Sequence, residues 1–305
     1  MKRKSCPAPT VLWRSGLPCL CWVLHTAWGA TFTVNSVNDP GDGVCDATES
    51  TLREAITAAN ASPGTDTIHF AIPGAGPHTL QPHAALPEIT DAVVLDATTQ
   101  PGFAGPPLVE LDGSQAGETA AGLVIRSGSS TVRGFAINRF SRGGIQLLNA
   151  GANVVEGCFL GTNPSGTSTF GGGAAGLSIS GSDDNRIGGS SPFATNVISG
   201  NAIGITIDGS SRTVIQGNLI GTDVTGTVAL GNDGSAGILI QYGGEGNRIG
   251  GPHPGEGNVI SGNNGAHDPA WGWGIDFGHG SVTNTVVEGN LIGTDITGTV
   301  ALGNN

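Results

Sequence analysis

A near-exact internal repeat constrains this chain more than any other sequence feature. The stretch 214–232 (VIQGNLIGTDVTGTVALGN) returns at 286–304 with three changes, and a diverged copy occupies 154–172. A second shared phrase, NRIGG followed by NVISGN, lies between the copies. Self-similarity of this kind is typical of a solenoid, in which each unit buries its apolar face only against its neighbours. The equivalent glycines are 60 and then 72 residues apart, at Gly161, Gly221 and Gly293.

Short apolar runs between glycine-rich turns predict many brief strands. The 305 residues include 53 glycines, without the G-X-Y period of collagen. Each unit opens with a glycine and two apolar residues in alternation, which places both on one face of a strand. These pairs are Leu123/Ile125, Ile145/Leu147, Leu177/Ile179, Ile205/Ile207, Ile238/Ile240 and Ile275/Phe277. The pattern predicts an all-β fold, a parallel β-helix whose coils rise about 4.8 Å each.

Stacking of the coils leads to two further expectations. Ile205, Ile238 and Ile275 should lie above one another and face the core, because each follows the glycine that opens its coil. Asparagine recurs at the corners, where it tolerates left-handed backbone and its amide can bond the equivalent asparagine one coil away. These corner residues are Asn196, Asn201, Asn218, Asn258, Asn263 and Asn290.

One helix is predicted ahead of the repeats. Thr51 and Glu54 have the spacing of a capping box, and Ser62-Pro63-Gly64 ends the helix. Its apolar residues recur at helical spacing, at Leu52, Ala55, Ile56 and Ala59. We expect this helix to form an N-terminal cap over the exposed strand edge of the first coil.

The segment around this helix carries a resemblance to a known family. The run GVCDATESTLREAITAAN, with IHFAIPGAGPHTLQPHAALPEIT and LDATTQPGFAGPPLVELDGS after it, resembles the N-terminal segment of bacterial exported proteins with a CSLREA-type motif. The resemblance implies a right-handed parallel β-helix of the pectin-lyase-like kind and no particular activity. Ser50 takes the place of the motif's cysteine, so Cys45 lacks the neighbour with which it could pair. We therefore expect Cys45 and Cys158 to be unbridged.

The N-terminal residues of the chain predict export. Residues 1–29 read as a signal peptide, with a charged start, an apolar stretch too short to span a membrane, and a cleavage site before Ala30. Residues 30–115 would form the strand and helix cap with the first coils, and 116–305 the β-helix repeats. Because the sequence stops inside a repeat copy, we expect a truncated product or a capping partner. The predicted location is extracellular or at the cell surface, with outer-membrane association as a variant.

The charge of the mature chain excludes several partners. Four of the 12 basic residues fall in the signal peptide, which leaves eight arginines against 24 acids and a formal charge of −16. Such a chain does not suit nucleic acid or anionic membrane surfaces, both of which need basic side chains. A polysaccharide or cell-surface glycan is the partner that we expect.

An insertion at 264–274 (NGAHDPAWGWG) holds the candidate binding residues. Trp271 and Trp273 are the only tryptophans of the mature chain and would share a face of an extended segment. Exposed indoles could stack on sugar rings, with His267 and Asp268 beside them. Under the alternative interpretation, the loop folds back and packs its tryptophans on the coil.

Candidate catalytic residues are Asp268, Asp276 and His279. The Gly-His-Gly run at 278–280 resembles an element of polygalacturonases, which share this fold, but the acid pair that those enzymes need is missing nearby. No metal ligand set is assigned, since Asp223 and Asp295 recur where an aspartate usually makes a turn. No cofactor is expected; calcium, used by pectate lyases of this fold, is the one alternative.

Two functions remain open at this stage. The first is a non-catalytic adhesive or carbohydrate-contacting scaffold. The second is a polysaccharide lyase or glycoside hydrolase that acts in a groove beside Asp268. Convergence of four side chains would favour the enzyme: Asp184, Asp208, Asp276 and His279.

Overall fold

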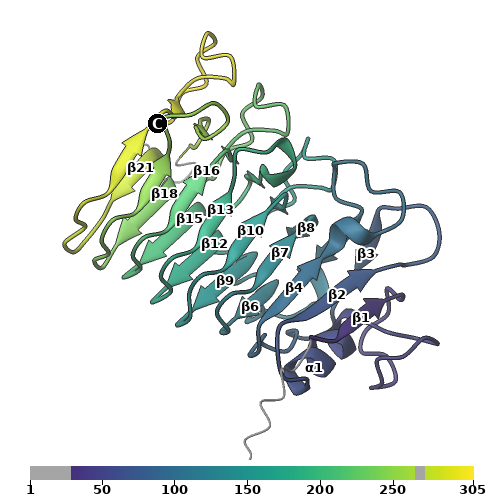
Figure 1. The fold of residues 1–305 in the computed structure, drawn as a ribbon. Helices are drawn as coiled ribbons and strands as arrows, with labels where there is room; N and C mark the ends of the chain where they lie inside the picture. Colours follow the sequence, from purple (N-terminus) through teal and green to yellow (C-terminus); the bar gives the residue numbers. More distant parts are fainter. Residues whose placement is uncertain (1–28, 265–271) are drawn as a thin grey trace, which may run out of the picture.

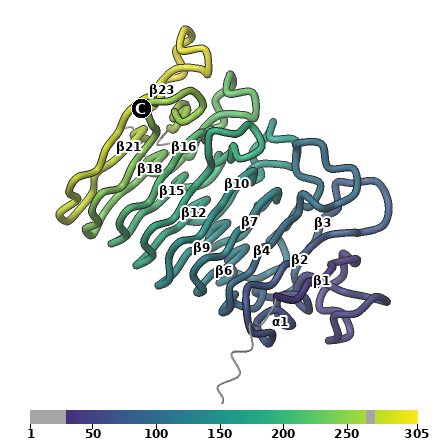
Figure 2. Tube along the Cα trace, viewed as in Figure 1, coloured from purple at the N-terminus to yellow at the C-terminus, as the bar shows by residue number. Residues whose placement is uncertain are grey.

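Three parallel sheets form a solenoid-like stack in the computed structural model, which describes residues 29–264 and 272–305 (Figure 1). Neighbouring strands within a sheet come from successive turns of the chain, and their pairing is parallel throughout. The turns lie side by side along one axis from the N-terminal to the C-terminal end (Figure 2). This arrangement confirms the predicted all-β, parallel, repeat-built architecture.

Each sheet contributes one side of the stack. Sheet A has nine strands: β1 (Thr31–Val34), β2 (Asp66–Phe70), β4 (Val93–Asp96), β7 (Thr131–Arg133), β10 (Val154–Glu156), β13 (Arg186–Gly188), β16 (Val214–Gln216), β19 (Arg248–Gly250) and β22 (Val286–Glu288). Sheet B has eight: β3 (His78–Leu80), β5 (Val109–Asp112), β8 (Phe135–Asn138), β11 (Phe159–Leu160), β14 (Val197–Ile198), β17 (Leu219–Ile220), β20 (Val259–Ile260) and β23 (Leu291–Ile292). Sheet C has six: β6 (Leu123–Ile125), β9 (Ile145–Leu148), β12 (Ala175–Ser180), β15 (Ile203–Asp208), β18 (Ala236–Gln241) and β21 (Trp273–Phe277).

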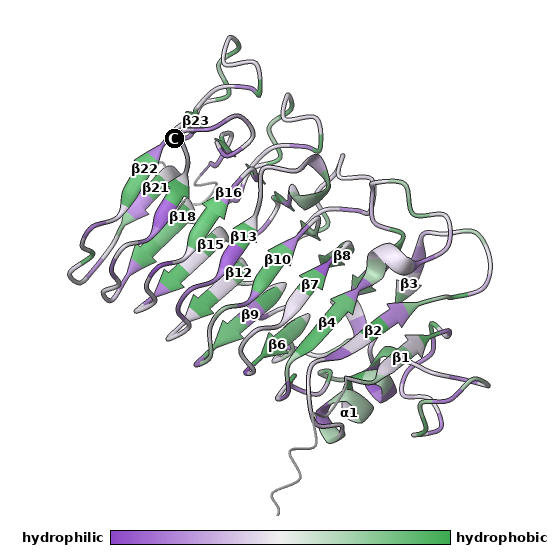
Figure 3. Cartoon of the chain, viewed as in Figure 1, coloured by the Kyte–Doolittle hydropathy of each residue, from purple (hydrophilic) through white to green (hydrophobic). Residues whose placement is uncertain are grey.

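The core is a column of aliphatic side chains inside the three sheets. Ile205 pairs with Ile238 and Ile238 with Ile275, in the predicted register. Ile205 and Ile238 are fully buried, and Ile275 packs against the same cluster. Hydrophobic residues are accordingly concentrated in the strands (Figure 3). The opening glycines are needed for close approach, because a Cβ on Gly204 would lie 2.4 Å from the Gly237 carbonyl oxygen.

Asparagine ladders fix the corners between sheets. Asn196 donates from Nδ2 to Oδ1 of Asn218, which donates in the same way to Asn258 at 2.9 Å, and Asn258 to Asn290. A second ladder runs from Asn201 through Asn232 and Asn263 to Asn304. Both confirm the expected bonding of corner asparagines from one coil to the next, but none of these asparagines takes left-handed backbone; glycines such as Gly200 and Gly217 do so just before them. Because each amide also bonds backbone groups, the ladders leave few of the buried corner groups unpaired.

Helix α1 (Leu52–Ala61) begins where the sequence predicts. Thr51 is its N-cap, and the Thr51 side chain and the Glu54 carboxylate each accept a backbone N–H of the other, which completes the capping box. The apolar face of α1 joins the main core and contacts β1 and β2 at the N-terminal end of the stack (Figure 1). Three short 3-10 helices follow: η1 (Ala97–Thr99), η2 (Gly113–Gln115) and η3 (Pro192–Ala194).

The two described cysteines are unbridged, as expected. Cys158 is fully buried at the start of the first asparagine ladder, where its backbone N–H donates to Oδ1 of Asn196. Burial raises the pKa of the Cys158 thiol to about 12, so this side chain behaves as a small buried residue.

A disulfide can be installed at the other cysteine. Sγ of Cys45 lies 3.0 Å from Oγ of Ser50, and both residues are in the approach to α1. We expect Ser50→Cys to form a disulfide with Cys45 in protein that starts at Ala30, and to raise the unfolding free energy by about 2 kcal/mol by closing a short loop. Thiol titration of the denatured, non-reduced variant should find one free thiol. Ser50→Ala, which should show two free thiols, is the control, and three free thiols in the Ser50→Cys protein would contradict the geometry.

The last coil is less covered than its predecessors. Phe277, Val287 and Ile292 are 50%, 41% and 48% exposed, whereas their partners Ile240, Ile249 and Ile260 are fully buried. Within the described residues, strands β21, β22 and β23 each have a neighbour on one side only. None of the described helices is long and apolar enough to cross a membrane.

Candidate functional site

Strand β21 carries the described part of the predicted binding residues. Trp273 opens the strand opposite Ala236 of β18, and its side chain is 43% exposed. Trp271, His267 and Asp268 lie outside the described residues. The structure therefore places one of the two tryptophans, at an accessible position on sheet C.

Asp276 and His279 come close enough to interact. Asp276 lies in β21 opposite Leu239 and is half-buried, while His279 follows the strand and is exposed. Burial raises the pKa of the Asp276 carboxyl above its usual value, and nearby His279 opposes this rise. A carboxyl group held protonated to higher pH is a property of general acids, although buried structural carboxyls share it.

The other two acids of the hypothetical catalytic cluster differ: Asp184 is paired elsewhere, whereas Oδ1 of Asp208 is buried without a hydrogen-bond partner among the described residues. Asp184, in the turn after β12, forms an ion pair with Arg212 at 2.6 Å. Asp208 ends β15 in register with Gln241. Among the described residues, no hydrogen bond or ion pair joins either acid to Asp276 or His279. The four side chains therefore form no hydrogen-bonded cluster.

Most arginines form ion pairs with acidic side chains. Seven of the eight arginines after residue 28 form ion pairs: Arg53, Arg126, Arg133, Arg139, Arg186, Arg212 and Arg248. On sheet A the pairs join successive strands, from Asp96 through Arg133 and Glu156 to Arg186. Each acid so paired is held in place by its arginine, which suits a structural role better than proton transfer.

The loop phrase GTD-x-TGT forms a compact turn around its aspartate. Oδ1 of Asp223 accepts the backbone N–H groups of Thr227 and Val228, and both carboxylate oxygens accept from the Thr225 hydroxyl. Asn163 caps the diverged copy in the same way. The described residues include no group of three or more potential metal-ligating side chains. The recurrence of aspartate in this phrase thus has a local structural cause.

Substitution of Asp223 tests this cause. Burial raises the pKa of Asp223, but hydrogen bonds from Thr225, Val228 and Thr227 lower it by more, so the folded pKa lies below the usual value. We expect Asp223→Ala to cost about 2 kcal/mol of stability at neutral pH. The wild-type advantage should disappear as pH falls from the unfolded-state pKa through the folded one. Asp223→Asn is the control, because Asn163 accepts the equivalent backbone N–H groups in the diverged copy. Denaturant titrations at neutral and acidic pH measure both effects; equal losses in the two variants would refute the capping role.

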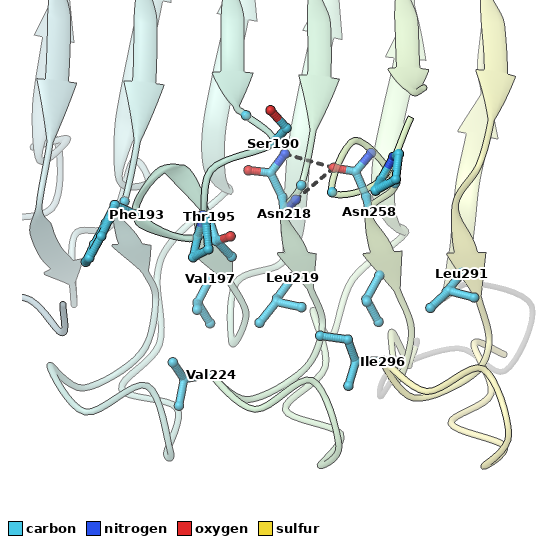
Figure 4. A pocket seen from close by; sticks show the side chains of 18 of the residues that line it. Ser190, Phe193, Thr195, Val197, Asn218, Leu219, Val224, Asn258, Leu291 and Ile296 are labelled. Atoms are coloured by element: carbon cyan, nitrogen blue, oxygen red, sulfur yellow. Dashed lines mark hydrogen bonds between the residues drawn. The ribbon is translucent and has the colours of Figure 1, made fainter. Parts of the chain in front are cut away.

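A long groove lies on the outer face of sheet B. Its floor is a second apolar cluster, separate from the main core, with one side chain per coil: Phe159 (β11), Val197 (β14), Leu219 (β17), Val259 (β20) and Leu291 (β23). The groove has a volume of about 690 Å³. Figure 4 shows the floor side chains in a row across successive strands.

Two sets of loops wall this groove, and each set occurs in every second coil. One wall is the GTD-x-TGT loops, which contribute Val224 and Ile296 and bond to one another, with the Ile296 N–H donating to the Gly226 carbonyl at 2.9 Å. The other wall is the loops that follow β13 and β19, with Phe193 and His253. Because a coil has a long loop at one corner or at the other, the structural unit is a pair of coils.

The sequence contained a signal for this groove that strict alternation hides. The sheet B strands from β11 to β23 each hold two consecutive apolar residues, such as Leu219-Ile220, whose side chains must point to opposite faces. Ile220 enters the main core and Leu219 the outer cluster. An apolar residue at each outward position from β11 to β23 indicates that this face is covered, and Phe159, Val197, Leu219 and Val259 are buried in the structure.

Comparisons with known proteins leave the family open. No family model matches this sequence. No curated protein matches it significantly either.

Proposed function

We propose that this chain is an exported right-handed parallel β-helix protein, related to the bacterial CSLREA-motif proteins. The support is twofold. In such a fold, each coil is expected to add one strand to each of three parallel sheets, which is the arrangement observed here. The TLREA stretch builds the capped helix α1 at the N-terminal end of the stack. The signal peptide and the placement outside the cell or at its surface belong to the same proposal.

The proposed function is contact with a polysaccharide or cell-surface glycan, without catalysis. The observation that carries it is the exposed indole of Trp273 on a rigid strand. A flat apolar ring in that position offers a stacking surface for a sugar ring at little entropic cost. The pairing of most arginines with acids supports a scaffold over an enzyme, since Arg142 is the one described arginine without an ion pair to a described acid.

Removal of both tryptophans tests the glycan contact. We expect Trp271→Ala with Trp273→Ala to abolish binding on a glycan array, because the stacking surface is lost, while the thermal midpoint of unfolding stays nearly unchanged. Phe193→Ala is the matched control, since Phe193 is an aromatic residue 70% exposed on another part of the surface. A double variant that unfolds several degrees earlier and binds as before would mean that the indoles pack on the coil.

One observation favours the second candidate, a polysaccharide lyase or glycoside hydrolase. The raised pKa of Asp276 would suit a general acid near His279. Release of reducing or unsaturated sugar ends from a polysaccharide, lost in Asp276→Asn and retained in Asp184→Asn, would replace the scaffold proposal with this one. Equal, background-level release by all three proteins agrees with the scaffold.

A further inference from the structure

The groove on sheet B has properties that glycan contact at β21 does not use. It runs on a different sheet from Trp273, and its walls repeat with every pair of coils. We propose that this groove binds the unbranched hydrocarbon chain of a long-chain fatty acid, laid along the axis of the stack. The proposal is independent of the glycan contact.

The first argument is the chemistry of the lining. Apart from Phe159, the floor and the wall formed by the GTD-x-TGT loops are aliphatic, from Leu219 and Leu291 to Val224 and Ile296 (Figure 4). Among the described lining residues there is no Asp, Glu, Lys or Arg. A groove without charge and with an aliphatic floor removes apolar surface of a ligand from water, which is the main favourable term for a hydrocarbon chain.

The second argument is that the asparagine amides of the lining, Asn218 and Asn258, are already used by the ladder. Nδ2 of Asn218 donates to Asn258 Oδ1 and to the carbonyls of Ile187 and Gln216. Oδ1 of Asn218 accepts from Asn196. A sugar ring or an extended peptide would have to give up its hydrogen bonds to water with few replacements in this groove. A hydrocarbon chain has no such bonds to lose.

The third argument is shape. The floor residues from Phe159 to Leu291 lie on five consecutive strands of sheet B, β11, β14, β17, β20 and β23. With neighbouring strands about 4.8 Å apart, the floor spans about 19 Å in a straight line. This span is close to the length of an extended palmitoyl chain. The floor is one side chain wide, which suits a single unbranched chain.

A second cavity beside the groove indicates which end of the groove would hold the polar end of the ligand. It has a volume of about 430 Å³, shares Phe193 with the groove, and is lined by Arg133, Glu156, Thr98 and Ser191. The terminal nitrogens of Arg133 pair with Asp96 and Glu156, but its Nε–H is buried without a hydrogen-bond partner among the described residues. The hydrocarbon chain would therefore extend along sheet B towards β23, with its polar end beside Arg133.

Two positions of one loop provide a matched test. Ile296 and Val300 are 49% and 54% exposed, but only Ile296 lines the groove. The full chain is titrated with cis-parinaric acid, a fluorescent fatty acid, and the probe is then displaced with palmitate. We expect saturable binding that Ile296→Glu weakens at least tenfold and Val300→Glu leaves unchanged. Both variants should keep the thermal midpoint of the wild type.

The overturning results are specific. Absence of saturable probe binding, or equal weakening by both substitutions, would refute the proposal. If Ile296→Glu lowers the thermal midpoint, Phe193→Glu replaces it, since the Phe193 side chain is 70% exposed at the opposite wall. Retained probe binding in that variant would equally refute it. The Trp271→Ala, Trp273→Ala protein should bind the probe like the wild type, so failure of the glycan contact and failure of the lipid site are distinguishable.

Discussion

Replacement of Ile238 by Asp should strongly destabilise the stack. Ile238 is fully buried between Ile205 and Ile275 in sheet C. The carboxylate would have no partner inside the aliphatic column, and we expect a loss of about 4 kcal/mol or more of unfolding free energy. The loss should be read as a lower denaturant midpoint, followed by circular dichroism.

The control for this prediction is a substitution on the outer face of the same sheet. Gln146 of β9 lies in register with Ser178 and is half-buried beside solvent. Gln146→Asp should shift the midpoint little, because its carboxylate stays hydrated. A small loss for Ile238→Asp, comparable with that of Gln146→Asp, would contradict the register of the core.

Loss of Asn218 should cost nearly as much, for a different reason. This amide lies in the middle of the first ladder. Asn218→Ala removes one of the two acceptors of Asn196 Nδ2 and the side-chain donor to the carbonyls of Ile187 and Gln216. Each buried polar group left unsatisfied costs about 1–3 kcal/mol. We therefore expect a loss of about 3 kcal/mol or more, measured by denaturant unfolding.

Cys158 offers the opposite substitution at the end of the same ladder. Its Sγ is near the carbonyls of Val132 and Glu156, the positions that correspond to the Asn218 contacts Ile187 and Gln216. Cys158→Asn should extend the ladder by one rung and leave stability equal or higher. A loss as large as that of Asn218→Ala would show that the ladder tolerates no added member.

Much of the fold followed from local rules in the sequence. The register of Ile205, Ile238 and Ile275 was predictable because alternation and the opening glycine fix which face each residue takes. The helix was predictable because its capping box is complete within four residues, Thr51 to Glu54. Corner asparagines were predictable because their amides can bond both backbone and each other.

The candidate sites were harder to predict from sequence because they depend on positions far apart in the chain. Phe159 and Leu291 belong to the same groove floor although 132 residues separate them. Asp184 pairs with Arg212 of the next coil. An acid that was a catalytic candidate in the sequence is therefore a neutralised surface group. The sequence predicted Trp271 and Trp273 on one face of an extended segment, but the exposure of Trp273 depends on what packs around sheet C.

Because the two loop types alternate from coil to coil, the architecture can be lengthened regularly only by pairs of coils. A duplication of one coil would bring two GTD-x-TGT loops, or two of the loops that follow β13 and β19, onto adjacent coils, where the bond from the Ile296 N–H to the Gly226 carbonyl has no equivalent. A duplication of two coils would preserve both walls and lengthen the groove by about 10 Å. Copying in even numbers is therefore the change in chain length that keeps the outer surface continuous, and the near-identity of 214–232 and 286–304 is the trace that such copying would leave.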